Sequence, residues 1–215
     1  LAQQIFRYNP GKTLQLFPPK HPYYKAPGKV KNIIEKAARR IKQNREEYER
    51  LKADPDYKDV HFDPKTGGLK ATHVGHNTED KGIVGFGMTG PQLEAECQDV
   101  AYRLGHRFIL RNEKVLREGT VSREIQTQLD AEMDGRIMDI RSITEIKDSY
   151  KWGLNSKNKQ VKHFNQEHDE NADTAILYFH DPNMYSRERI ERSIEDLKNI
   201  DATDENGNLL GRKIT

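Results

Sequence analysis

The pattern of hydrophobic and polar positions over residues 133–179 predicts a strand, a helix and a second strand. The first strand follows a turn signal, and its successive side chains point to opposite faces, so Asp139 and Arg141 share one face. A polar helix over residues 157–168 comes next. The second strand, Ala175–Phe179, is continuously apolar, which predicts a central position in a sheet.

The rest of the chain alternates between short elements and polar connections. It predicts a charged helix (30–52), two short strands (60–62 and 69–74), a glycine-rich loop (82–90), a second helix (91–104) and a strand (106–110). A long irregular excursion (111–133) and a final helix from Ser186 onwards follow. Dense proline before the first helix predicts an extended arm.

These predictions divide the chain into four parts: an arm (1–28), a charged helix (29–55), a folded domain (56–200) and a tail (201–215). Strands and helices that alternate in this way indicate an α+β fold, with a central mixed or antiparallel sheet packed by helices.

Composition limits the functional classes. Among 215 residues, 34% are hydrophobic and 33% charged, which fits a small core, and the net charge of +2 gives no global signal for nucleic-acid binding. The single cysteine, Cys97, excludes an intrachain disulfide and a cysteine-based metal cluster, and its helical spacing from Leu93 predicts a buried thiol. No apolar run reaches the roughly 18 residues of a membrane span. We expect a chain in a reducing compartment.

Charged side chains on the first strand are the main candidates for chemistry. Asp139 and Arg141 stand side by side, and Asp134 lies in the turn upstream. This is a pattern by which nuclease folds present charge to a phosphate. His73 and His76 are three residues apart, but Gly75 favours a strand that runs into a loop rather than a helix. A metal ligand, a phosphate contact and plain surface all remain open for these histidines.

The chain also resembles a known group of proteins. It is similar to the toxin-type nuclease domains of the barnase/EndoU/colicin/RelE-like superfamily, as found at the C-terminus of contact-dependent inhibition (CdiA-type) proteins and in fusions to phage minor head proteins. The residues that carry the resemblance are Asp134-Gly135, Asp139-Ile140-Arg141, Trp152, the helix with Lys157 and Gln166, and the strand 175–179, within a match over residues 56–200.

The resemblance implies a nuclease that cleaves RNA by metal-independent acid/base catalysis and needs no cofactor. Arg141 and Lys159 would neutralise the phosphate, His163 or His168 would transfer protons, and Asp139 would orient one of these groups. The expected substrate contacts are His73, His76, Lys157 and Gln166.

The same residues support a metal-dependent alternative of the PD-(D/E)xK kind. Asp134 and Asp139 would then hold Mg²⁺, with Glu94 or Glu96 as a further ligand. Arg141 stands where this class has lysine, and it retains its proton at neutral pH, so it binds phosphate but exchanges no proton.

A third interpretation is a non-catalytic phage head-associated structural or interaction module, which Arg141 and the long arm favour. The expected partners are RNA, an immunity protein for a toxin, and phage capsid or portal proteins for a head-associated module. The expected location is accordingly cytoplasmic or on the phage particle.

Overall fold

The structure is a computed structural model that describes residues 27–113, 128–198, 202–203 and 209–210, with side chains described from Glu35 to Leu197 within these ranges. The predicted arm lies outside the described residues except for residues 27 and 28, which already belong to the first helix, and most of the predicted tail lies outside them as well. The helices are α1 (Pro27–Ala53), α2 (Gly90–Arg103), α3 (Lys151–His168) and α4 (Arg187–Lys198), with a 3-10 turn at Pro182–Met184.

A six-stranded mixed sheet forms the centre of the fold, with strand order β1-β2-β5-β6-β7-β8. Its strands are β1 (Tyr57–Phe62), β2 (Leu69–His73), β5 (Arg107–Leu110), β6 (Ala131–Met133), β7 (Arg136–Ile143) and β8 (Thr174–Phe179). The β2/β5 and β7/β8 pairs are parallel and the other pairs are antiparallel. The short pairs β3 (Ile83–Gly85) with β4 (Met88–Thr89), and β9 (Ala202–Thr203) with β10 (Leu209–Leu210), lie apart from this sheet. The predicted α+β fold with a central mixed sheet packed by helices is confirmed.

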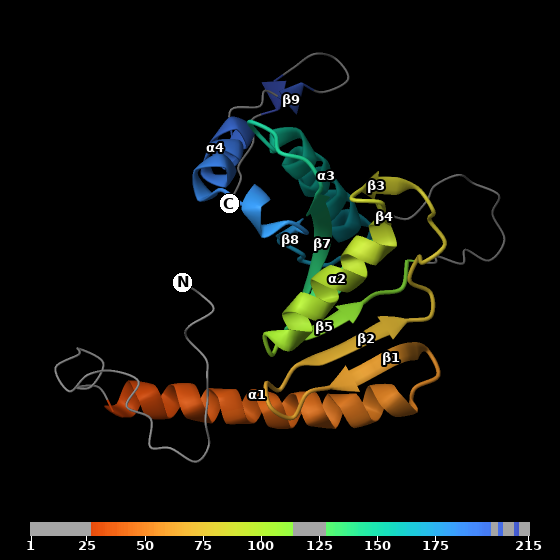
Figure 1. Cartoon of the computed structure of the whole chain (residues 1–215), viewed down its shortest axis with the longest axis vertical. Coiled ribbons are helices and arrows are strands. Elements are labelled where there is room, and N and C mark those ends of the chain that lie inside the picture. The colour runs from red at the N-terminus through yellow and green to blue at the C-terminus, as the bar shows by residue number, and fades with distance from the viewer. Residues whose placement is uncertain (1–26, 114–127, 199–201, 204–208, 211–215) are drawn as a thin grey trace.

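Helices cover both faces of the sheet (Figure 1). On one face, Cys97 and Ala101 of α2 pack against a core that includes Met138 and Ile140 of β7. Side chains of β7 alternate, so Ile137 points to the other face, where it packs against α3. The predicted burial of the Cys97 thiol is confirmed.

Helix α1 packs on the same sheet at its other end. Leu51 is fully buried with Leu69, Ala71 and Ile109, and Tyr48 packs against this cluster. The charged helix of the sequence pattern is therefore amphipathic, and its apolar stripe covers β1 and β2.

Three features differ from the sequence-based expectation. Helix α3 begins at Lys151 instead of near residue 157. Its N-cap residue Tyr150 makes no side-chain cap hydrogen bond, so the sequence contains no capping signal for this start. Strand β8 lies at an edge of the sheet instead of its centre. Its apolar side chains are half-buried because neighbouring segments, including Tyr150, pack over them.

The third difference lies in the connections. The glycine-rich loop forms the β3–β4 hairpin, and the predicted irregular excursion contains strand β6, which is only three residues long. A strand of three residues is too short to show an alternating pattern.

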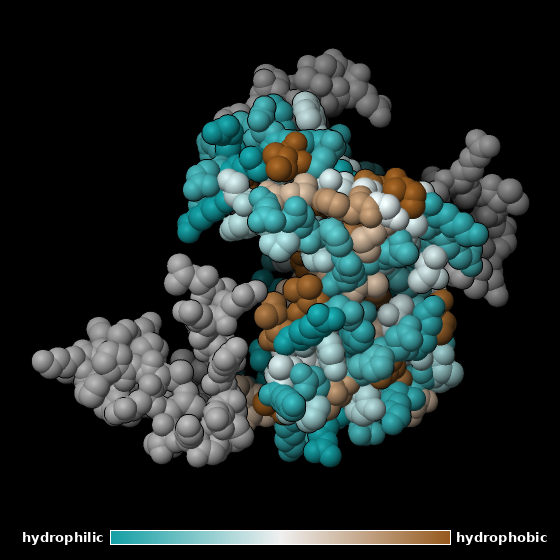
Figure 2. Space-filling model, viewed as in Figure 1, coloured by the Kyte–Doolittle hydropathy of each residue, from teal (hydrophilic) through white to brown (hydrophobic). Residues whose placement is uncertain are grey.

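Hydrophilic side chains dominate the face shown in Figure 2, and hydrophobic ones form separate patches. No helix in the described part of the chain is both long and apolar enough to cross a membrane.

Candidate functional site

The hairpin between β6 and β7 determines which residues of these two strands lie opposite each other in the candidate site. Asp134 and Gly135 both have positive φ, at 50° and 85°, as a two-residue turn between antiparallel strands requires. Met133 therefore pairs with Arg136 and Ala131 with Met138. One step further along the ladder, Asp130 comes opposite Asp139.

Asp139 and Asp130 form a buried pair of carboxyl groups. Asp139 is fully buried, and the Asp130 side chain is 13% exposed. The backbone N–H of Ile140 donates to Asp130 Oδ2 over 2.8 Å, which holds this carboxyl group against β7. Burial and the neighbouring Asp130 raise the pKa of Asp139, while Lys157 opposes the rise.

Lys157 extends from the second turn of α3 to this pair. Its Nζ lies 2.9 Å from Asp139 Oδ2 and 3.8 Å from Asp130 Oδ2. It also donates to Gln160 Oε1 over 3.4 Å. The Lys157 side chain is only 15% exposed, so its charge acts on the two carboxyl groups with little screening by water.

Arg141 lies on the same face of β7 as Asp139, beside the first turn of α3. A Cβ atom on Gly153 would come within 3.2 Å of Arg141 Nε. Glycine inside a helix costs about 0.5–1 kcal/mol relative to alanine, and here it leaves room for the guanidinium group. Arg141 is exposed, and its charge adds to the positive end of the α3 dipole.

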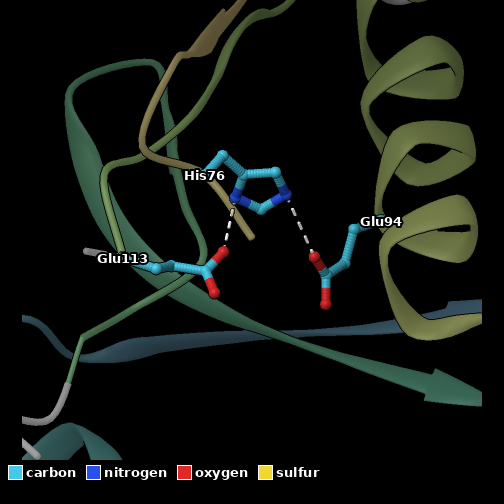
Figure 3. A group of neighbouring side chains, drawn as sticks. All are labelled: His76, Glu94 and Glu113. Atoms are coloured by element: carbon cyan, nitrogen blue, oxygen red, sulfur yellow. Dashed lines mark ion pairs between the residues drawn. The ribbon is translucent and has the colours of Figure 1, made fainter. Parts of the chain in front are cut away.

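A histidine held between two glutamates lies just after the end of β2 (Figure 3). His76 Nδ1 is 2.5 Å from Glu113 Oε1, and His76 Nε2 is 3.2 Å from Glu94 Oε2. The imidazole side chain is 1% exposed. Gly75 permits this arrangement: a Cβ there would lie 2.1 Å from Asn112 Oδ1, and the N–H of Glu113 donates to the Gly75 carbonyl.

Charge links this cluster to the aspartate pair. Burial raises the pKa of Glu94, and the charges of Asp130 and Glu113 raise it further. Burial alone would lower the pKa of His76, but its two glutamates raise it to about 9. The charge of Asp130 therefore acts on Glu94, and Glu94 in turn acts on His76.

The structure separates several predicted site residues from Lys157 and the aspartate pair. At about 100° per residue, Lys159, His163 and Gln166 lie about 120–180° around α3 from Lys157, and all three are exposed. His168 is about 16 Å along the helix from Lys157, where its ring stacks on Phe164.

Three further candidates have partners elsewhere. His73 packs edge-on against Tyr57, and its Nδ1 accepts from the N–H of Gly75. Asp134 is five residues before Asp139, roughly 15 Å along the strand, and accepts from the Arg107 N–H as it contacts His106. The Mg²⁺ pair predicted from Asp134 and Asp139 is therefore not assembled. Glu96 bonds instead with Tyr178 and His180.

Sequence reasoning missed Asp130, Glu113 and Gln160. The first two lie in or beside the polar excursion, where no periodicity marks them. Lys157 was expected only as a substrate contact, because its distance from Asp139 depends on how α3 packs on β7.

Comparisons with known proteins gave no match: no family model, no curated protein and no solved structure shows significant similarity to the chain.

Proposed function

We propose that the protein is a nuclease that hydrolyses phosphodiester bonds with the help of a divalent cation. The observation that carries the proposal is the buried Asp130/Asp139 pair with Lys157 Nζ 2.9 Å from Asp139. The charge of Asp130 also acts on the carboxyl group of Glu94. This favours the PD-(D/E)xK-like alternative, with Asp130 in the place expected for Asp134.

The aspartate pair suits a hard divalent cation. Carboxylate oxygens are the ligands that Mg²⁺ prefers, and two adjacent buried carboxyl groups disfavour each other's ionised form until a cation neutralises them. The raised pKa of Asp139 is the expected consequence. A bound divalent cation would activate water and neutralise charge that develops on the phosphate.

In the PD-(D/E)xK pattern a single lysine stabilises negative charge and contacts the phosphate. Here Lys157 and Arg141 would divide these two roles. Lys157 Nζ is close enough to Asp139 to stabilise negative charge and to position a water molecule beside it. Arg141 lies two residues further along the strand and offers a planar donor group that suits a phosphate oxygen pair. The absence of lysine at position 141 is then no obstacle to activity.

A phosphate group also fits the surface beside the aspartates. The first turn of α3 contains no acidic residue, and its N-cap residue Tyr150 makes no side-chain cap hydrogen bond. Helix N-termini attract anions, and Arg141 and Lys151 add positive charge there. The scissile phosphate would lie between this positive turn and the Asp130/Asp139 pair.

Metal-independent cleavage of RNA receives less support. It requires a proton-transfer group near the phosphate contacts, and the predicted groups Lys159 and His163 are exposed on the far side of α3 from Lys157. The resemblance to toxin-type nucleases, with an immunity protein or phage proteins as partners, stays a prediction.

Variant proteins test the proposal. Labelled RNA, single-stranded DNA and duplex DNA are incubated with Mg²⁺ or Mn²⁺ and with the wild type, Asp139→Asn, Lys157→Met, or the control Lys159→Met. Asp139→Asn should lower cleavage at least about 100-fold, as loss of a group that acts in the transition state does, and Lys159→Met should leave it within about twofold. Equal cleavage by Asp139→Asn and wild type would refute the proposal.

A further inference from the structure

We infer that His76 and Glu94 form a binding site for a divalent transition-metal ion, and that Glu113 orients the histidine. This site is distinct from the aspartate pair of the proposed function, although the charge of Asp130 acts on Glu94. The cluster His76, Glu94 and Glu113 brings its ligand atoms within 4.8 Å of one another.

The spacing of the two ligand atoms fits metal coordination. His76 Nε2 and Glu94 Oε2 are 3.2 Å apart. With metal bonds of about 2.0–2.2 Å, two ligands at right angles or in tetrahedral positions lie about 2.8–3.6 Å apart. A cation can therefore bind both atoms without a large movement of either side chain.

The ring nitrogens of His76 lack the aligned hydrogen bonds that a buried structural histidine normally makes. Both ring nitrogens are buried, and their contacts with the two glutamates are ion pairs that lack the alignment of a hydrogen bond. Buried polar atoms without hydrogen bonds are costly. A cation at Nε2 would replace the proton on that nitrogen, which is released to water, and leave the Nδ1 proton to Glu113.

Glu113 occupies the position of an orienting residue. A histidine that binds metal usually donates its other ring N–H to a carboxylate, which fixes the tautomer and the ring direction. Glu113 Oε1 lies 2.5 Å from Nδ1, on the opposite side of the ring from Glu94 (Figure 3). The two glutamates therefore have different roles.

The ligand types indicate the class of metal. Imidazole suits zinc and neighbouring transition metals, whereas Mg²⁺ prefers oxygen ligands alone. We therefore expect Zn²⁺ to bind through His76, Mn²⁺ to bind there much more weakly, and Mg²⁺ to bind independently of His76.

Calorimetric titration with Zn²⁺ tests the site without measuring activity. His76→Gln should lower the Zn²⁺ affinity at least about 100-fold, and Glu113→Gln about 10- to 100-fold. His73→Gln is the matched control, because His73 points at Tyr57, and it should bind as the wild type does. Wild-type affinity in His76→Gln would overturn the inference.

A spectroscopic measurement on the unmodified chain covers the case in which a variant fails to fold. Co²⁺ should shift one exchangeable imidazole proton far outside the diamagnetic range of the NMR spectrum, since Nδ1–H would be held by Glu113. Co²⁺ binding without such a signal would overturn the inference. Asp139→Asn should bind Zn²⁺ as tightly as the wild type does. The Zn²⁺ titration therefore tests this inference separately from the cleavage assay, which tests the nuclease proposal.

Discussion

Replacing Asp139 by asparagine should stabilise the protein in EDTA while it abolishes activity. Asp139 is fully buried beside Asp130, so its charge has lost its hydration and faces a second carboxyl group. An incompletely compensated buried charge costs several kcal/mol. Asparagine relieves that cost but gives up the charged contact with Lys157, worth about 1.5–3 kcal/mol.

We expect a net gain of about 1–2 kcal/mol in the free energy of unfolding at pH 7, from the difference between these terms. For a chain of this size, the gain raises the melting temperature by about 2–8 °C. The gain also depends on pH. The folded state raises the pKa of Asp139 above its unfolded value of 3.8, so ionisation costs stability only as the pH rises above that value. Near pH 3.5 the variant and the wild type should be equally stable.

Denaturant unfolding in EDTA measures the gain in stability, and thermal unfolding with added Mg²⁺ measures how far the cation stabilises each protein. Mg²⁺ at 100 times its dissociation constant should stabilise the wild type by about 2.7 kcal/mol and leave Asp139→Asn unchanged. Asp148→Asn, at an exposed position, is the control and should change neither value. A loss of stability in Asp139→Asn, or equal stabilisation of both proteins by Mg²⁺, would show that Asp139 has a structural role.

Three further substitutions test the scaffold. Glu47→Gln should lower the free energy of unfolding by about 1 kcal/mol at pH 7, because hydrogen bonds from Arg50 and Arg107 lower the pKa of Glu47 to about 2. In urea unfolding, this advantage of the wild type should be lost as the pH falls from 4.5 towards 2. Gly68→Ala should lower the melting temperature by several degrees, since its Cβ would lie 2.0 Å from a backbone carbonyl oxygen of α2. Leu51→Ala should cost about 2–5 kcal/mol in guanidinium unfolding, because Leu51 is fully buried between α1 and the sheet.

Each of these substitutions has a neutral counterpart. Lys42 and Glu46 form an exposed pair on α1, so Glu46→Gln should show no comparable pH dependence. Gly90→Ala meets no atom closer than 4.0 Å and should be tolerated. Leu104→Ala removes a side chain that is 68% exposed and should change stability by less than about 0.5 kcal/mol. Effects of equal size in a substitution and its counterpart would contradict the packing described above.

The strands and helices with clear periodicity could be predicted from the sequence. The alternation in β7 placed Asp139 and Arg141 on one face, and the apolar spacing in α2 predicted the burial of Cys97. Both predictions depend only on local geometry, which a pattern of polar and apolar residues records.

The candidate site could be predicted only in part, because it depends on contacts between distant segments. Asp139 was identified from its own strand, whereas Asp130 becomes its neighbour only through the two-residue turn of the β6–β7 hairpin. Lys157 reaches Asp139 because of how α3 packs on β7, and α3 begins six residues earlier than its sequence signals. Glu113 meets His76 across two loops, and no local pattern contains that contact.

The most direct test of the account is cleavage of labelled RNA and DNA strands by the wild-type protein in Mg²⁺ and in EDTA. The account predicts that at least one strand is cut in Mg²⁺ and that neither is cut in EDTA, because the Asp130/Asp139 pair acts through a bound cation. Cleavage that persists unchanged in EDTA would contradict it and return the metal-independent mechanism to first place.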